Sequence, residues 1–213
     1  MQPIQGLHHI TAVASDAQAN VDFYERVLGQ RLVKTTVNFD DPGTYHLYYG
    51  DEVGTPGTIM TFFPWSHMSR GRRGNGETAE VLYAVPEGAA GYWAERLARM
   101  GVEVGDVEER FGEQVLLFDD PDGMRLGLVE TDDPATLELW DGGPVPVEYA
   151  LRGFHGVTLW LESTEPTAAV LTEQMGYRHM ATEGARSRYA GASDDRALYV
   201  DLVARPGAPR GAF

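Results

Sequence analysis

The 213-residue sequence contains no cysteine and few basic residues. Without cysteine the chain forms no disulfide bond, offers no thiolate to a metal and has no cysteine nucleophile. Lysine and arginine number 17 against 32 aspartates and glutamates, and the net charge of −15 argues against nucleic acid or an anionic membrane surface as a partner. No apolar run approaches the ~18 residues of a membrane span, and we find no N-terminal secretion signal, so we expect a cytoplasmic protein.

Two adjacent histidines, His8 and His9, lie in a β-branched and apolar run that ends at Ala14. The run predicts a strand, in which neighbouring side chains point to opposite faces, so only one of the two imidazoles faces a given cavity. His9 then shares its face with Thr11. A neutral imidazole on a rigid strand is a good ligand for iron, manganese or zinc. The alternative is one hydrogen-bonded core histidine beside one partly exposed histidine.

One order of predicted elements, strand, helix and three strands, occurs three times along the chain. In the first copy Ser15 or Asp16 caps a helix over residues 16–28, and Gly29 ends it. We therefore predict an α+β fold of tandem strand–helix–three-strand (βαβββ) modules, three visible and a fourth missing. Modules 1, 2 and 3 cover residues 4–66, 79–131 and 152–204, with a connector at 132–151 and a linker-like tail at 205–213.

Several motifs of the chain resemble one known superfamily. The pattern is similar to the vicinal oxygen chelate proteins, which include glyoxalase I, bleomycin-resistance proteins and extradiol dioxygenases. Within that superfamily the chain most resembles bacterial ring-cleaving dioxygenases that act on hydroquinone-type rings. The motifs that carry the resemblance lie at residues 7–11, 21–24, 27–34, 34–40, 45–51, 61–64 and 152–159.

The resemblance implies a function and a set of site residues. It implies paired modules 1 and 2 within residues 1–131, with sheets that curl around a metal bound by His9. Fe(II), or else Mn(II), would serve a dioxygenase that opens a hydroquinone- or catechol-like ring with dioxygen. His8 and Thr11 would act as catalytic residues that orient the site. The implied partners are a small aromatic substrate and dioxygen, and self-association into a homo-oligomer stays open.

Three positions depart from the pattern of this superfamily. The usual glutamate ligand of the second module falls at Gly127, and the third-module counterpart of His9 is Gly156, so that His155 matches His8. Asp201 lies near the glutamate position of the third module, where we expect a carboxylate at the surface or behind the metal ligands. The remaining histidine and glutamate of the ring-cleaving relatives belong to a fourth module.

These departures leave two explanations and two rival functions open. We expect a chain truncated at a module boundary, and the alternative is a second copy that contributes ligands across an interface. A glyoxalase-type isomerase or lyase would use the same scaffold without oxygen. A non-catalytic protein that binds a small molecule needs no complete metal site.

Other histidines and aromatic residues have a structural and a functional interpretation. His46 is either a half-exposed strand histidine or a substrate contact, whereas His67 and His179 are expected at the surface. An aromatic set is expected either to line a pocket for a ring or to join the core. It comprises Tyr45, Tyr48, Tyr49, Phe62, Phe63 and Trp65.

Overall fold

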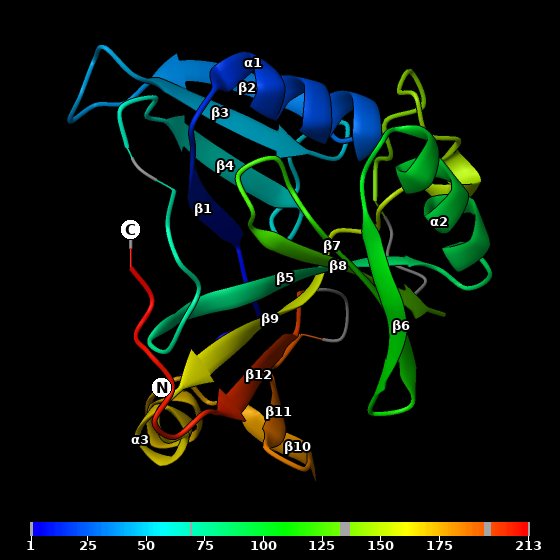
Figure 1. Cartoon of the computed structure of the whole chain (residues 1–213). Helices are drawn as coiled ribbons and strands as arrows, with labels where there is room; N and C mark the ends of the chain where they lie inside the picture. Colours follow the sequence, from blue (N-terminus) through cyan, green and yellow to red (C-terminus); the bar gives the residue numbers. More distant parts are fainter. Residues whose placement is uncertain (1, 69, 133–136, 194–196, 213) are drawn as a thin grey trace.

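The computed structural model describes residues 2–68, 70–132, 137–193 and 197–212, and its strands form two curled sheets (Figure 1). Module 1 contains β1 (His9–Ala14), α1 (Ala17–Val21), the π-helix η1 (Asp22–Val27), β2 (Arg31–Val37), β3 (Tyr45–Gly50) and β4 (Ile59–Pro64). Module 2 contains β5 (Glu77–Pro86), α2 (Ala90–Arg99), β6 (Val104–Arg110), β7 (Glu113–Asp119) and β8 (Arg125–Thr131). After the short helix η2 (Val147–Tyr149), module 3 contains β9 (Phe154–Leu161), α3 (Glu165–Ala169), the π-helix η3 (Val170–Gln174), β10 (Arg178–Glu183), β11 (Arg186–Ala190) and β12 (Tyr199–Ala204).

All three modules share one strand order. In space the first strand lies beside the fourth, followed by the third and the second, as in β1-β4-β3-β2. The first and fourth strands are parallel, and the other neighbours within a module are antiparallel. A helix connects the first strand to the second in each copy. The predicted α+β fold of repeated βαβββ modules is therefore confirmed.

The edge-to-edge pairing differs from the prediction. We expected modules 1 and 2 to pair, but the antiparallel pairing of β5 with β9 joins modules 2 and 3 into one eight-stranded sheet. Module 1 keeps its own four-stranded sheet. The first strand of every module presents a free edge to which the first strand of another module can bond. The order of the modules along the chain therefore does not determine which two of them pair.

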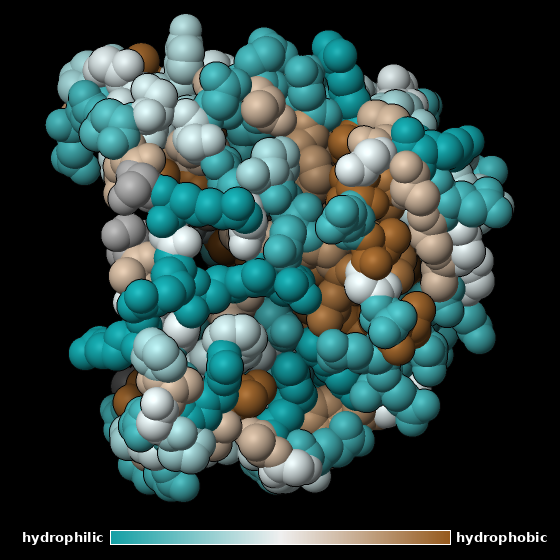
Figure 2. Space-filling model, viewed as in Figure 1, coloured by the Kyte–Doolittle hydropathy of each residue, from teal (hydrophilic) through white to brown (hydrophobic). Residues whose placement is uncertain are grey.

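Modules 1 and 2 contact each other through side chains instead of strand edges. The buried Tyr24 hydroxyl donates to Asp120 Oδ2 over 3.1 Å, and Arg96 Nε donates to the Val27 carbonyl over 2.8 Å. Beside these contacts a groove of about 840 Å³ runs between η1 and β6, with Asp120 in its wall. Apolar side chains gather on this part of the surface (Figure 2). Burial raises the pKa of Asp120 to about 6, because the hydrogen bonds that it accepts only partly offset the lost hydration.

The first helix follows its sequence signals. Asp16 is the cap, because its side chain accepts a hydrogen bond of 2.7 Å from the Ala19 amide. The helix continues as η1, which buries Phe23 and Tyr24 against the sheet. Gly29 then ends it with φ +70°, a conformation that glycine adopts without strain.

The largest core side chains come from both sheets. Tyr49 and Phe62, two of the aromatic residues expected to form either a pocket or the core, are fully buried beside Tyr24. Trp93 on α2 and Tyr83 on β5 extend the same core into module 2. No helix in the described part of the chain is long and apolar enough to cross a membrane.

The connector and the tail are bound to the body of the protein. Residues 133–136 of the connector lie outside the described residues, and farther along Tyr149 stacks on Tyr92 with ring centroids 4.2 Å apart. The tail was expected to be linker-like. Instead, the Asn75 amide donates hydrogen bonds to the carbonyls of Arg205 and Ala208, and Arg72 forms a backbone bridge with Ala212. A short asparagine side chain thus holds the tail against the segment between β4 and β5.

Candidate functional site

The strand registers place one residue of each module at an equivalent position. His9, Glu80 and Gly156 each lie opposite the first residue of the last strand of their module. Two residues farther along, the facing pairs are Thr11 with Thr61, Leu82 with Gly127 and Thr158 with Asp201. The same scaffold position therefore carries an imidazole, a carboxylate and no side chain in the three copies.

In module 1 these positions belong to a surface that we call the open face. His9 and Thr11 are exposed, whereas Ile10 and Ala12 pack against the core on the other side, so the predicted alternation holds from His9 onward. Thr61 Oγ1 donates to Thr11 Oγ1 over 2.9 Å. The open face consists of His9, Thr11, His46, Tyr48 and Phe63, and Thr61, at the same register, is fully buried.

Aromatic rings and one further imidazole form the rest of the open face. The Tyr48 hydroxyl lies 2.9 Å from His46 Nδ1, and the His46 ring packs on Phe63 with centroids 4.0 Å apart. Burial, then the charges of Lys34 and His9, lower the pKa of His46, so this imidazole is neutral near pH 7. The site thus combines polar groups with aromatic walls, a lining that suits a ring bearing hydroxyl groups.

The two neighbouring histidines do not point apart as we predicted. Their Nδ1 atoms are 3.2 Å apart, and their rings meet edge to face. The reason is that β1 begins at His9, so the pleat does not constrain His8. One Nδ1 must donate and the other accept. If His9 donates, its Nε2 lone pair is free, which is the arrangement that metal-binding histidines adopt with a neighbouring acceptor.

The described residues do not complete a metal site. No group of three or more His, Cys, Asp or Glu side chains comes together among them in an arrangement that could hold a metal ion. The two-histidine, one-carboxylate set of iron oxygenases needs three protein ligands. The open face therefore fits one ligand of such a set, His9, and the others would have to come from outside the described residues.

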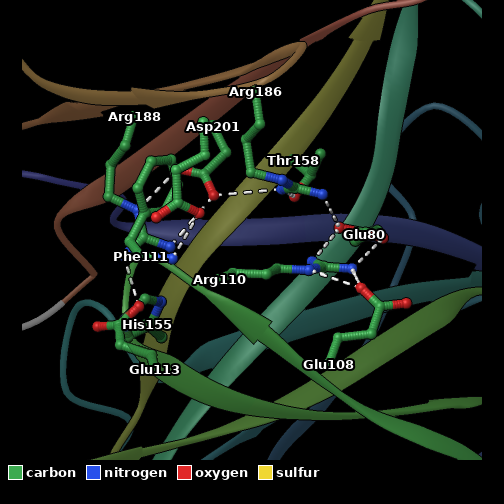
Figure 3. A network of polar contacts seen from close by, with 11 residues as sticks. Glu80, Glu108, Arg110, Phe111, Glu113, His155, Thr158, Arg186, Arg188 and Asp201 are labelled. Atoms are coloured by element: carbon green, nitrogen blue, oxygen red, sulfur yellow. Dashed lines mark hydrogen bonds and ion pairs between the residues drawn. The ribbon is translucent and has the colours of Figure 1, made fainter.

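The corresponding face of modules 2 and 3 holds a network of arginines and carboxylates (Figure 3). Arg110 binds Glu80 with both terminal nitrogens, at 2.7 and 3.1 Å. Arg186 reaches Glu80, Thr158 and Asp201 over 2.9 to 3.4 Å. We expected Asp201 near the surface or behind metal ligands, but it is 1% exposed and paired with arginine, because β12 lies inside the eight-stranded sheet.

The other end of this network connects β7 with module 3. Arg188 Nε binds Asp201 Oδ1 over 2.9 Å, and its terminal nitrogen Nη1 binds Glu113. The guanidinium group lies between the rings of Phe111 and Tyr199, 4.4 and 4.6 Å from their centroids. Figure 3 shows how these side chains converge from β7, β11 and β12.

A β-bulge brings His155 into this network. The pairing of β5 with β9 shifts between Leu82 and Tyr83, so His155 is an extra residue, and its Nε2 reaches Glu113 Oε1 at 3.0 Å. Burial alone would raise the pKa of Glu113, but the hydrogen bonds and charges of His155 and Arg188 lower it. Burial opposes ionisation of Glu80 too, and Arg110 and Arg186 nevertheless lower its pKa.

Two of the equivalent positions, Gly127 in module 2 and Gly156 in module 3, have no room for a ligand side chain. A Cβ on Gly156 would lie 2.4 Å from the Tyr199 carbonyl oxygen. A Cβ on Gly127 would lie 2.6 Å from Leu82 Cδ2, within a small apolar cluster. The backbone and core of these modules therefore exclude the superfamily ligands, and guanidinium groups provide the positive charge instead.

Sequence reasoning missed the arginines and Glu113. A usable signal was present, because Arg186 and Arg188 are two residues apart on one short strand and therefore share a face. The carboxylates that pair with them are distant in sequence, so no local pattern connects the two sets. The remaining histidines are where we predicted: His67 and His179 are exposed and His46 is half-buried.

Comparison with known proteins agrees with this geometry. A family model described as the glyoxalase/bleomycin resistance protein/dioxygenase superfamily matches residues 6–128. MhqO of Bacillus subtilis, provisionally named a ring-cleaving dioxygenase, is 48% identical over 189 residues, which are 89% of this chain and 60% of MhqO. A chlorohydroquinone/hydroquinone 1,2-dioxygenase of Sphingobium indicum is 39% identical over 211 residues, covering 96% of this chain and 66% of that enzyme.

Solved structures show the same similarity. The crystal structure of a Bacillus subtilis protein, provisionally described as a dioxygenase, superposes with a TM-score of 0.94 at 45% identity, covering 100% of this chain and 67% of that chain. Glyoxalase I of Zea mays has a TM-score of 0.72 at 14% identity, which shows a shared fold alone. The chain spans 58 to 66% of the length of the curated relatives that it matches. The chain belongs to the glyoxalase/bleomycin resistance protein/dioxygenase superfamily.

Proposed function

We propose that this chain forms part of a metal-dependent dioxygenase that opens a hydroquinone- or catechol-like aromatic ring. The observation that carries the proposal is the exposed His9 on the open face, beside a histidine whose Nδ1 can accept a hydrogen bond from His9 Nδ1–H. The names of relatives that are 39 to 48% identical support the same reaction class.

The residues of the open face have distinct roles in this proposal. His9 Nε2 is a metal ligand, and His8 orients the imidazole by accepting a hydrogen bond from His9 Nδ1–H. Thr11, held by the Thr61 hydroxyl, has an oxygen atom with which to orient the hydroxyl group of a substrate. Tyr48 and Phe63 provide apolar walls for the ring.

Fe(II) fits this proposal best and Mn(II) is the alternative, because imidazole with carboxylate is the usual ligand set of such oxygenases. A bound metal supplies the redox and Lewis-acid chemistry for the reaction with dioxygen. Since the described residues contribute a single ligand, we assign no chemical step to the metal. A cytoplasmic location, the absence of nucleic-acid partners and self-association stay predictions.

A second candidate function is binding of an aromatic molecule without catalysis. The incomplete ligand set of the described residues favours it, because binding of a ring needs the walls of the open face but no metal. The two candidates differ in metal content and in oxygen consumption.

The proposal is tested with the chain purified without oxygen and loaded with Fe(II) or Mn(II). Metal analysis and an oxygen electrode then measure bound metal and the uptake of dioxygen with hydroquinone. We expect both to be lost in His9→Ala and kept in His179→Ala, a matched control at an exposed imidazole on β10. Oxygen uptake that survives His9→Ala refutes the assignment. Hydroquinone binding without metal or oxygen uptake supports the second candidate.

A further inference from the structure

A β-bulge turns one basic side chain of module 1 toward the open face. On β2, Leu32 lies opposite the buried Tyr49 and packs against the core, so regular alternation would place Lys34 on the core side too. The register shifts between these two residues, and Val33 is the extra residue of a bulge. Lys34 therefore lies opposite Tyr48 of the open face, with its Nζ atom 5.1 Å from the centre of the Tyr48 ring. Bulges are common beside functional sites, where they redirect a side chain.

Lys34 also differs from the other basic residues of the chain. Of the 17 basic residues it is the only lysine. Its side chain is exposed, and it takes part in none of the ion pairs found among the described residues. A compact ammonium group on a flexible stem is well suited to bind an anion from outside the fold.

The equivalent row of residues in module 3 shows how this fold neutralises a positive charge at such a place. In module 1 the residues that lie opposite one another across the four strands are Lys34, Tyr48, Thr61 and Thr11. In module 3 the corresponding residues are Ala181, Arg188, Asp201 and Thr158. The arginine of the second row binds the aspartate over 2.9 Å. Threonine takes the place of that aspartate in module 1, so the lysine has no counter-ion in its row.

The charge of Lys34 acts on the interior of the open face. After burial, it is the next cause of the lowered pKa of His46. The His46 imidazole contacts the Tyr48 hydroxyl through Nδ1, and its buried Nε2 atom has no hydrogen-bond partner among the described residues. The ammonium group is therefore directed at the polar groups of the site as well as at solvent.

We propose that Lys34 is a specificity-determining residue whose ammonium group binds a carboxylate on the aromatic substrate of the open face. The inference rests on the proposed function, because it assumes that a hydroxylated ring binds beside His9. Three strand spacings of about 4.8 Å separate β2 from β1, so Lys34 and Thr11 lie about 14 Å apart along their row. Side chains that extend inward from both ends leave space for one substituted ring, with its hydroxyl groups toward β1 and its carboxylate toward β2.

The main experiment compares two ligands that differ in charge. Gentisate is hydroquinone with one ring carboxylate, and its methyl ester has a similar shape without the charge. Isothermal titration calorimetry of the full chain measures both dissociation constants at low salt. EDTA in the buffer prevents chelation of a metal by gentisate. The ratio of the two constants isolates the contribution of the carboxylate, because the rest of the ring is common to both ligands.

Substitutions at Lys34 should change this ratio and little else. Lys34→Met removes the charge but keeps most of the length, and we expect the ratio to shift about five- to tenfold in favour of the ester. Affinity for the ester itself should stay the same. Lys34→Arg should keep most of the preference, and Arg178→Met, which removes an exposed charge on β10, should not alter it. Added salt should reduce the preference of the original chain, because it screens exposed charges.

The single lysine permits a second measurement that needs no substitution. Acetic anhydride acetylates the Lys34 amine and the N-terminal amine, and peptide mass spectrometry follows the two rates separately. At equal saturation of the site, gentisate should slow the acetylation of Lys34 more than the methyl ester does. The N-terminal amine serves as the control within each sample and should react at the same rate with either ligand.

The outcomes separate this inference from the proposed function. If the aromatic ligands bind but Lys34→Met leaves the ratio unchanged, the role of Lys34 is refuted and the proposed function is kept. Equal protection of Lys34 by gentisate and the ester refutes the role of Lys34 too. If hydroquinone, gentisate and the ester all fail to bind, the proposed function is refuted, and this inference with it.

Discussion

Arg188→Met should destabilise the protein far more than the same substitution at an exposed arginine. The Arg188 side chain is 5% exposed and binds Asp201, whose side chain is 2% exposed, and Glu113. Methionine keeps most of the length of the side chain but leaves these carboxylates with fewer positive partners. Removing one member of a buried ion pair costs about 3–5 kcal/mol, because the remaining charge stays buried.

The expected loss is large for a chain of this size. Domains unfold with about 5–15 kcal/mol, so the variant would lose a substantial part of its stability. At 2–4 °C for each kcal/mol, the melting temperature should fall by roughly 6–20 °C. Arg186 still binds Asp201 and His155 still contacts Glu113, so we expect the lower half of this range.

Urea unfolding followed by circular dichroism measures the difference. The matched control is Arg26→Met, since Arg26 pairs with Asp22 at 3.2 Å but is 72% exposed, and an exposed pair of this kind contributes under about 1 kcal/mol. Adding Asp201→Asn to Arg188→Met should recover part of the loss, because it removes the charge left unpaired. Equal effects of Arg188→Met and Arg26→Met would refute the reasoning.

Three further predictions concern burial and backbone space. Burial raises the pKa of Asp120 to about 6, so the charged carboxylate lowers the stability of the fold as the pH rises through that value. Asp120→Asn should therefore stabilise the protein by up to about 3 kcal/mol at pH 8 but only slightly at pH 4, and urea unfolding at the two pH values measures the difference. Gly156→Ala should destabilise the protein by about 1–3 kcal/mol, because its Cβ would overlap the Tyr199 carbonyl. Gly91→Ala on α2, with open space around it, should instead stabilise the protein by roughly 0.5–1 kcal/mol, and thermal melts measure both effects. The lowered pKa values of Glu80 and Glu113 stabilise the fold above pH 4.5, which is near the pKa of these groups in the unfolded chain. This stabilisation should be lost as the pH falls through the lower pKa values of the folded protein. In an acid titration, the free energy of unfolding of the Glu80→Gln variant should therefore decrease less steeply with falling pH.

Local patterns predicted the elements well because they depend on neighbouring residues. The strand–helix–three-strand order, the cap at Asp16 and the end of the helix at Gly29 all follow from spacing and backbone preference. The opposite orientation of His8 and His9 was wrong, because the strand begins at His9, two residues after Leu7, where the predicted strand begins. A shift of one residue at the end of a strand changes the face that a side chain occupies.

Contacts between modules depend on residues that no local pattern relates. The sequence does not indicate that β5 pairs with β9, because the edges of similar first strands present similar backbone groups. Likewise, Glu80, Arg110 and Arg186 meet through three separate strands, and Asp201 is buried only because β12 lies inside the larger sheet. The tail is bound because one asparagine reaches its carbonyls.

From the order of its residues alone, this protein could be recognised as repeated βαβββ modules with one candidate metal ligand, His9. That information is local, since hydrophobic period and capping act over a few residues. Tertiary packing decided which strand edges join. It also decided which charged groups fill the face of modules 2 and 3 that corresponds to the open face of module 1. The physical reason is that hydrogen-bonding edges and ion pairs bring together groups that are far apart along the chain.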